Sequence, residues 1–285
     1  MHSSLLLFVG LVAAGWRWRW RPSRQSWSDR WQNALIAFCL PPLMLLSTAV
    51  AVLAMGHHGT MMGQSVSPLG CRVSTLMLAL TASASLDSLA KAAWFWLKLR
   101  QYPLITLPSG EQARQLDIDS PFAAQVGIWR SALVVSRGWL EQLTVAEQRA
   151  MLRHEQAHAN YRDPLWFLGL GVVRRFTLWL PQTNAIWEEL LLLREMRADC
   201  WAARDTEPLL LAELLVKLSR SMAAMTAAPN PGYVGFSTVT SLDRLEQRIA
   251  ALLQPDLAVD RPATNGQLIW LIAAAVPFLA IGLHR

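Results

Sequence analysis

The sequence predicts a mainly α-helical membrane protein with about four transmembrane helices and a cytoplasmic α+β domain that contains a small β-sheet or hairpin. Of the 285 residues, 53% are hydrophobic and only 16% are charged, a balance more apolar than that of an ordinary soluble domain. Several uncharged runs approach the length that crosses a bilayer. We therefore expect three transmembrane helices in 1–97, a soluble domain in 98–260 and a fourth transmembrane helix in 261–285.

The clearest predicted span is 34–56, which carries no charge and exceeds the about 20 residues that a bilayer-crossing helix needs. The run 3–16 has the hydrophobicity of a signal peptide, but its arginines follow the apolar stretch, and this order favours a first membrane span. Near the C-terminus, 267–283 is a further uncharged run and should cross once. The loop-like stretch 226–240 is the main candidate for a flexible segment.

The third apolar run, 73–97, contains Asp87 and Lys91. These residues are four apart, so they lie on one helix face and can pair there, which favours a span that faces protein. A metal transporter would place ionisable groups in several spans, and only this pair qualifies. Two arginines interrupt the run 165–180, so it either packs on the soluble domain or lies at the membrane surface.

The charge distribution predicts the orientation in the membrane. The formal net charge is +6, and five arginines crowd between the first two apolar runs, as in a short cytoplasmic loop at 17–33: Arg17, Arg19, Arg21, Arg24 and Arg30. No nucleic-acid-binding motif accompanies them, so nucleic acid is not an expected partner. Counting spans from this loop places 98–266 in the cytoplasm of a multi-pass protein of the plasma or inner membrane, in contact with lipid. The three cysteines have no CxxC spacing, which argues against a disulfide framework or a cysteine zinc site.

The segment LTVAEQRAMLRHEQAHANYRDP predicts a capped helix. Thr144 stands three residues before Glu147, the spacing of a capping box, and Pro164 marks the expected end. Within it, His154 and His158 are four apart, so both imidazoles project from one face and can hold one Zn²⁺ ion. Glu155 lies beside them as the expected general base.

A third ligand is required, because HExxH occurs by chance in about one chain in a hundred of this length. The segment NAIWEELLLLREMRADCWAA predicts a second long helix, in which Glu195 stands four residues before Asp199 on the same face. Glu195 would complete a His, His, Glu set with one open coordination position, as in a catalytic zinc site. Asp199 would then hydrogen-bond a ligand histidine and fix its tautomer.

Several weaker candidates receive no role. The competing interpretation of the second helix is a solvated salt-bridge face made by Glu195, Asp199 and the neighbouring arginines. His57 and His58 could bind copper, but an exposed loop pair is more often without function, and His284 is next to the terminus. Arg244 and Arg248 could assist an oxyanion, but arginines on a charged helix are usually solvated, and neither is assigned.

The stretches HEQAHANYRDP, WLP at 179–181 and REMRADCWAA resemble the membrane gluzincin metallopeptidases. The resemblance covers 98–253 by motif and is closest to the beta-lactam sensor antirepressor (BlaR and MecR) type, with the HtpX and CAAX prenyl protease type as the second branch. It implies three spans, a cytoplasmic protease and a fourth span, with His154, His158 and Glu195 as ligands. Antirepressor relatives often carry cysteine before the aspartate, whereas here Ala198 precedes Asp199. The chain stops at Arg285, so we do not expect the external penicillin-binding sensor of that branch.

The sequence thus predicts a zinc metalloendopeptidase that hydrolyses peptide bonds in cytoplasmic or membrane-proximal proteins, such as a transcriptional repressor in a signalling pathway. The alternative is a membrane signalling or scaffold protein whose zinc site is structural or vestigial. Before the HExxH helix, 131–136 has strand character and 121–128 can pair with it as an edge strand that a peptide substrate could extend. The sequence carries no signal for the natural substrate, the activating stimulus or the oligomeric state.

Overall fold

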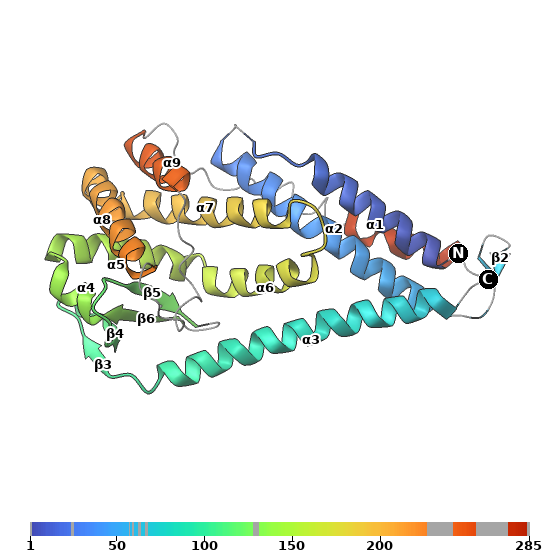
Figure 1. The fold of residues 1–285 in the computed structure, drawn as a ribbon, viewed down its shortest axis with the longest axis horizontal. Coiled ribbons are helices and arrows are strands. Elements are labelled where there is room, and N and C mark those ends of the chain that lie inside the picture. Colours follow the sequence, from blue (N-terminus) through green and yellow to red (C-terminus); the bar gives the residue numbers. More distant parts are fainter. Residues whose placement is uncertain are drawn as a thin grey trace. The chain divides into compact units, whose positions relative to one another are not determined.

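The computed structural model describes residues 2–23, 26–56, 58, 60–61, 64–65, 68–127, 131–226, 242–254 and 273–283, most of them in helices, with a small mixed sheet (Figure 1). Contacts divide the chain into two compact units. Unit 1 comprises Met1–Ala90, Gly169–Leu191 and Asp260–Arg285, and unit 2 comprises Lys91–Leu168 and Leu192–Val259. The predicted loop 226–240 lies outside the described residues except for its first residue, which ends a helix.

Two of the described helices are long and apolar enough to cross a membrane, α2 (Trp27–Met55) and α3 (Pro68–Leu99). α3 covers the predicted span 73–97, and α2 covers the predicted span 34–56 except for its last residue, Gly56, which is the C-cap. The most apolar window of α2 is 56% buried by protein, whereas that of α3 is 11% buried, so α3 presents most of its apolar surface outward. α1 (His2–Arg19) is helical over the predicted first span. Of the predicted fourth span, 267–272 lie outside the described residues and Val276–Leu283 form a 3₁₀ helix, η3.

The predicted arginine-rich loop at 17–33 is wrong in its extent. α1 continues to Arg19 and α2 begins at Trp27, with Ser26 as its N-cap. The prediction assigned Arg17 to a solvated loop because it weighed charge alone, but the side chain is fully buried in unit 1. Its guanidinium donates to the carbonyl oxygens of Ala37 (3.1 Å) and Phe38 (2.6 Å) and to Thr183 Oγ1 (2.5 Å).

Two prolines in α2 explain why the carbonyl oxygens of Ala37 and Phe38 accept hydrogen bonds from Arg17. In an α-helix the carbonyl of residue i accepts from the N–H of residue i+4, and proline has no N–H to give. The positions four residues after Ala37 and Phe38 are Pro41 and Pro42, both inside α2. Arg17 therefore supplies the two donors that the proline pair removes, which accounts for a buried cation in an apolar unit.

Two further polar contacts lie within unit 1. Asp87 on α3 accepts a hydrogen bond from Arg175 of α6 (Asp163–Phe176) at 2.5 Å. The sequence predicted Lys91 as a partner of Asp87 and did not predict Arg175. Arg30 on α2 pairs with Glu189 of α7 (Thr183–Ala202) at 2.8 Å. The two arginines in the run 165–180 therefore belong to a helix with polar partners, and this helix is not among the candidate spans.

Unit 2 contains a four-stranded mixed sheet in the order β3-β4-β6-β5. β5 (Ala123–Val126) pairs antiparallel with β6 (Ala132–Ser136), which confirms the predicted strand pair, although Ile128 of the predicted 121–128 lies outside the described residues. β4 (Gln112–Leu116) pairs parallel with β6 and antiparallel with β3 (Leu104–Thr106). These two strands were not predicted, because both are short and β4 is largely polar in sequence.

Helices cover the sheet and hold the motif helix in place. Leu133 and Val135 of β6 face a core shared with α4 (Arg137–Gln142), α5 (Val145–Asn160), α8 (Pro208–Thr226) and α9 (Leu242–Leu253), while Val134 faces a second cluster. The predicted capping box of α5 is confirmed, with Thr144 and Glu147 bonded reciprocally. The predicted helix end is wrong by a few residues: α5 stops at Asn160, and Pro164 lies in the first turn of α6, where its missing N–H costs nothing.

Candidate metal centre

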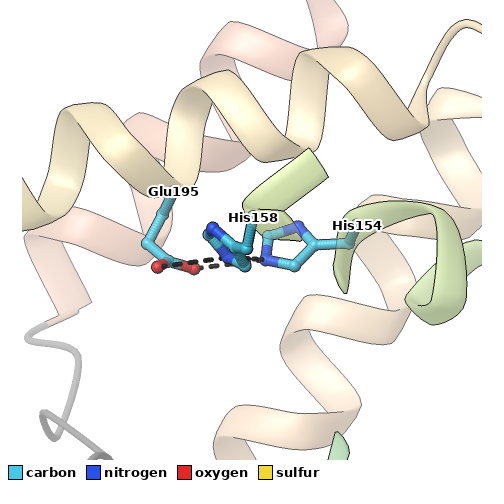
Figure 2. Close-up of side chains that lie close together, drawn as sticks. All are labelled: His154, His158 and Glu195. Carbon is cyan, nitrogen blue, oxygen red and sulfur yellow. Dashed lines mark hydrogen bonds and ion pairs between the residues drawn. The ribbon is translucent and has the colours of Figure 1, made fainter. Parts of the chain in front are cut away.

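The structure brings His154, His158 and Glu195 together within unit 2. Both imidazoles project from α5 toward the carboxylate of Glu195 on α7 (Figure 2). The two Nε2 atoms are 3.1 Å apart, His154 Nε2 lies 3.3 Å from Glu195 Oε2, and His158 Nε2 lies 3.7 Å from Glu195 Oε1. Ligand atoms on a tetrahedral zinc ion with bonds of about 2.0–2.1 Å are about 3.3 Å apart. The three side chains could therefore hold a metal ion, and their donor set suits zinc.

An aspartate fixes the orientation of each imidazole. Asp199 Oδ1 lies 2.9 Å from His154 Nδ1, and Asp163 Oδ2 lies 2.8 Å from His158 Nδ1. Each Nδ1 can thus donate its proton to a carboxylate, which leaves the Nε2 lone pair directed toward the shared centre. Two lone pairs at 3.1 Å repel each other unless a cation or a proton lies between them.

Three arginines surround these carboxylates. Arg248 of α9 binds Asp199 with two parallel hydrogen bonds of 2.7 and 2.8 Å, and Arg197 of α7 binds Asp163 at 2.5 Å. Arg194 donates to Oε1 of Glu195 at 2.6 and 2.9 Å. Asp199, Asp163 and Glu195 therefore each have a guanidinium partner, which makes the burial of these three carboxylates tolerable.

Glu155 is buried beside the donor group without belonging to it. Its side chain is 7% exposed, and its Oε2 accepts the backbone N–H of Gln125 in β5 at 2.9 Å. Burial raises the pKa of Glu155, and this effect outweighs the lowering by His158 and His154. A raised pKa makes the carboxylate a stronger base, which favours its acceptance of a proton.

The charges of the centre favour a bound cation. Burial opposes the charged form of His154, but Asp199 and Glu195 outweigh it and raise the pKa of this imidazole to about 10. Burial likewise opposes ionisation of Glu195, and Arg194 and His154 hold its pKa well below the usual range. The negative charge of Asp199 and Glu195 that raises the pKa of His154 would equally favour a metal cation between the two imidazoles. A metal ion that binds Nε2 of His154 must displace any proton on that nitrogen.

The burial excludes a solvated salt-bridge face for the REMRAD segment. Asp199 is 1% exposed and the side chain of Arg197 is 11% exposed. Each faces partners inside unit 2 and not water.

No family model matches the chain, and no curated protein matches its sequence. The functional proposal therefore depends on the motifs of the sequence and on the geometry of the centre.

Sequence reasoning missed four residues of this centre: Asp163, Arg194, Arg197 and Arg248. Asp163 follows His158 by five residues, and the backbone returns it to the histidine through Arg162, whose φ is +54°. That turn is hard to foresee, because arginine rarely adopts a positive φ. Arg197 and Arg248 were considered as ordinary solvated arginines, but Arg248 is 9% exposed. His57 and His284, which were weak candidates, lie outside the described residues.

Proposed function

We propose that the chain is a membrane-bound zinc metalloendopeptidase that cleaves cytoplasmic or membrane-proximal proteins. The observation that carries the proposal is the convergence of two imidazole nitrogens and one carboxylate oxygen within 4.8 Å of one another. Three protein ligands leave one position of a tetrahedral ion for water or substrate, the arrangement of catalytic and not of structural zinc sites. Glu155, adjacent to His154 in sequence and buried, is the expected proton acceptor.

The metal, Glu155 and the two aspartates would each have a separate role in hydrolysis. Bound zinc would polarise the scissile carbonyl and lower the pKa of the attacking water towards about 7. Glu155, whose Oε2 accepts from the N–H of Gln125, would take the water proton and return it to the leaving amide nitrogen. Asp199 and Asp163 hold the two imidazoles in the tautomer that leaves Nε2 free for the metal.

The outer edge of β5 is the proposed substrate platform. β5 is the last strand in the order β3-β4-β6-β5, so its second edge has no strand partner among the described residues. Gln125 directs its N–H to Glu155 and therefore away from β6, which places this edge beside the proposed base. An extended peptide that pairs with the edge would bring its backbone to the centre by main-chain hydrogen bonds.

The proposed membrane arrangement is supported by the charge distribution of the sequence and by the two candidate helices. We propose four spans, with the soluble part of the chain in the cytoplasm of a multi-pass plasma or inner membrane protein, as positive-inside counting indicates. The outward apolar surface of α3 supports a lipid neighbour for this helix. The motifs further support membership of the membrane gluzincin class, closest to the antirepressor type, for which a transcriptional repressor is the proposed substrate.

The test compares the purified, detergent-solubilised wild type with Glu155→Gln. We expect the variant to retain stoichiometric zinc and to cleave a peptide library at least about 10²-fold more slowly, because the proton acceptor is lost while the ligands remain. Glu141→Gln is the matched control, since that side chain is 63% exposed on α4 and should leave cleavage unchanged.

Equal cleavage by wild type and Glu155→Gln would end the catalytic proposal. Stoichiometric zinc without hydrolysis, together with unfolding on chelation, would favour the alternative of a scaffold protein with a structural zinc site.

A further inference from the structure

We propose that Arg248 and Arg197 are positioning residues, each of which fixes an aspartate that in turn fixes one histidine of the metal centre. The inference rests on the metal site of the proposed function, and it concerns residues to which no motif gives a role. Its geometric basis is a repeated arrangement within unit 2, in which arginine, aspartate and histidine are joined by direct hydrogen bonds on both sides of the centre.

The first arrangement is Arg248, Asp199 and His154. Arg248 Nε donates to Asp199 Oδ2 at 2.7 Å and its Nη2 donates to Oδ1 at 2.8 Å, so the guanidinium fork fixes the plane of the carboxylate. Oδ1 is also the oxygen that lies 2.9 Å from His154 Nδ1. A carboxylate held in one plane accepts the imidazole proton best along the lone pairs that lie in that plane. The orientation of Arg248 therefore determines where His154 Nε2 points.

The second arrangement is Arg197, Asp163 and His158. Arg197 Nη2 lies 2.5 Å from Asp163 Oδ1, and the other carboxylate oxygen, Oδ2, lies 2.8 Å from His158 Nδ1. The guanidinium of Arg197 also stacks on the ring of Tyr161 at 3.9 Å, which fixes it from a second side. The aspartates of both arrangements are at most 5% exposed, so water competes little for these bonds.

The two arrangements differ in where the arginine comes from. Arg197 stands on α7, two residues from the ligand Glu195, whereas Arg248 comes from α9, a helix that follows the other elements of unit 2 in sequence. α9 packs on α8 and places Leu252 and Ile249 in the shared core. The packing of α9 through its apolar face therefore positions Arg248 beside Asp199. The HExxH helix and α7 alone do not supply this arginine.

The competing explanation is that these ion pairs only stabilise the fold. Removing one partner of a buried pair destabilises a protein in any case, so loss of stability cannot separate the two roles. The geometry of a bound metal does separate them, because a purely structural arginine would leave the coordination of His154 unchanged in the folded protein.

The experiment uses the full chain in detergent, stripped with a chelator and titrated with Co²⁺ and with Zn²⁺. For Arg248→Ala we expect a Zn²⁺ affinity about 10–100-fold lower than that of wild type and altered visible absorption bands of bound Co²⁺. Added guanidinium should restore part of both signals. Arg248→Lys keeps the charge but not the fork, so it should lie between wild type and Arg248→Ala. Arg149→Ala is the matched control, since Arg149 is exposed on α5, the helix that bears both histidines.

Wild-type affinity and an unchanged Co²⁺ spectrum in folded Arg248→Ala would overturn the inference while leaving the metal site intact. If Arg248→Ala does not fold, Arg248→Lys decides by the same spectrum: altered bands support the positioning role and unaltered bands refute it. A wild-type protein that binds neither Co²⁺ nor Zn²⁺ refutes the proposed function together with this inference, so the two failures are distinguishable.

Discussion

Arg17 in unit 1 and Arg248 in unit 2 are both buried arginines, and they differ in what accepts their hydrogen bonds. Arg17 donates to two carbonyls that Pro41 and Pro42 leave without a helical donor. Arg248 donates to the carboxylate that orients a histidine. Arg17 replaces two hydrogen-bond donors that the prolines of α2 lack. Arg248 neutralises the carboxylate of Asp199, which lies beside the group of metal donors. The acceptor, more than the burial of the cation, therefore indicates whether a buried arginine belongs to the scaffold or to the site.

The largest effect on the site to which Arg248 belongs is expected for Glu195→Ala, which removes a proposed metal ligand. Zinc binding by four ligands is worth about 10–16 kcal/mol in small zinc domains, or about 2.5–4 kcal/mol for each ligand, so we expect zinc affinity to fall by roughly 10²- to 10³-fold. Metal analysis after equilibrium dialysis measures the effect. Glu213→Ala on α8 is the control, because that side chain is exposed. Full zinc retention by Glu195→Ala would remove this residue from the site.

Arg17→Leu should lower the free energy of unfolding and leave the zinc affinity of the folded protein unchanged, whereas Glu195→Ala should lower the zinc affinity. The carbonyls of Ala37 and Phe38 lose their donors, and each unsatisfied buried group costs about 1–3 kcal/mol, so we expect a loss of about 3 kcal/mol. Thermal unfolding in detergent measures it.

A double-mutant cycle sharpens this prediction. Replacing Pro41 and Pro42 with alanine restores the two backbone N–H groups, and in the Arg17→Leu background this change should recover part of the lost stability. No recovery in the cycle would mean that Arg17 stabilises unit 1 for another reason.

The smallest effect is expected at a more exposed charge, Glu147 in the capping box of α5. Burial opposes its ionisation, but hydrogen bonds from Lys217 and Thr144 outweigh this effect and lower its pKa from the usual 4.5. A carboxyl with a lowered folded-state pKa stabilises the protein fully above its unfolded-state pKa, and this contribution is lost as the pH falls through the lower folded-state pKa. Glu147→Gln should therefore cost about 0.5–1 kcal/mol at neutral pH and flatten the acid limb of stability below about pH 4.5. Thermal unfolding of both proteins at a series of pH values checks this, and parallel pH profiles would contradict it.

Local sequence rules were sufficient where a single helix or strand pair sets the outcome. The capping box of Thr144 and Glu147, the long second helix and the pairing of 123–126 with 132–135 all depend on residues close in sequence, and all are present. Rules that count charges were less reliable. They assigned Arg17 and Arg248 to solvent, because composition does not reveal that a proline pair or a buried aspartate lies opposite.

By itself the sequence determined that two histidines share one helix face and that Glu195 and Asp199 share another, because the 3.6-residue period of a helix fixes both. Only the tertiary structure decided that these faces meet with their donor atoms within 4.8 Å, that Asp163 returns to His158 through a tight turn, and that α9 contributes Arg248. The physical reason is that helical periodicity acts over a few residues, whereas the packing of helices distant in sequence depends on the whole core between them.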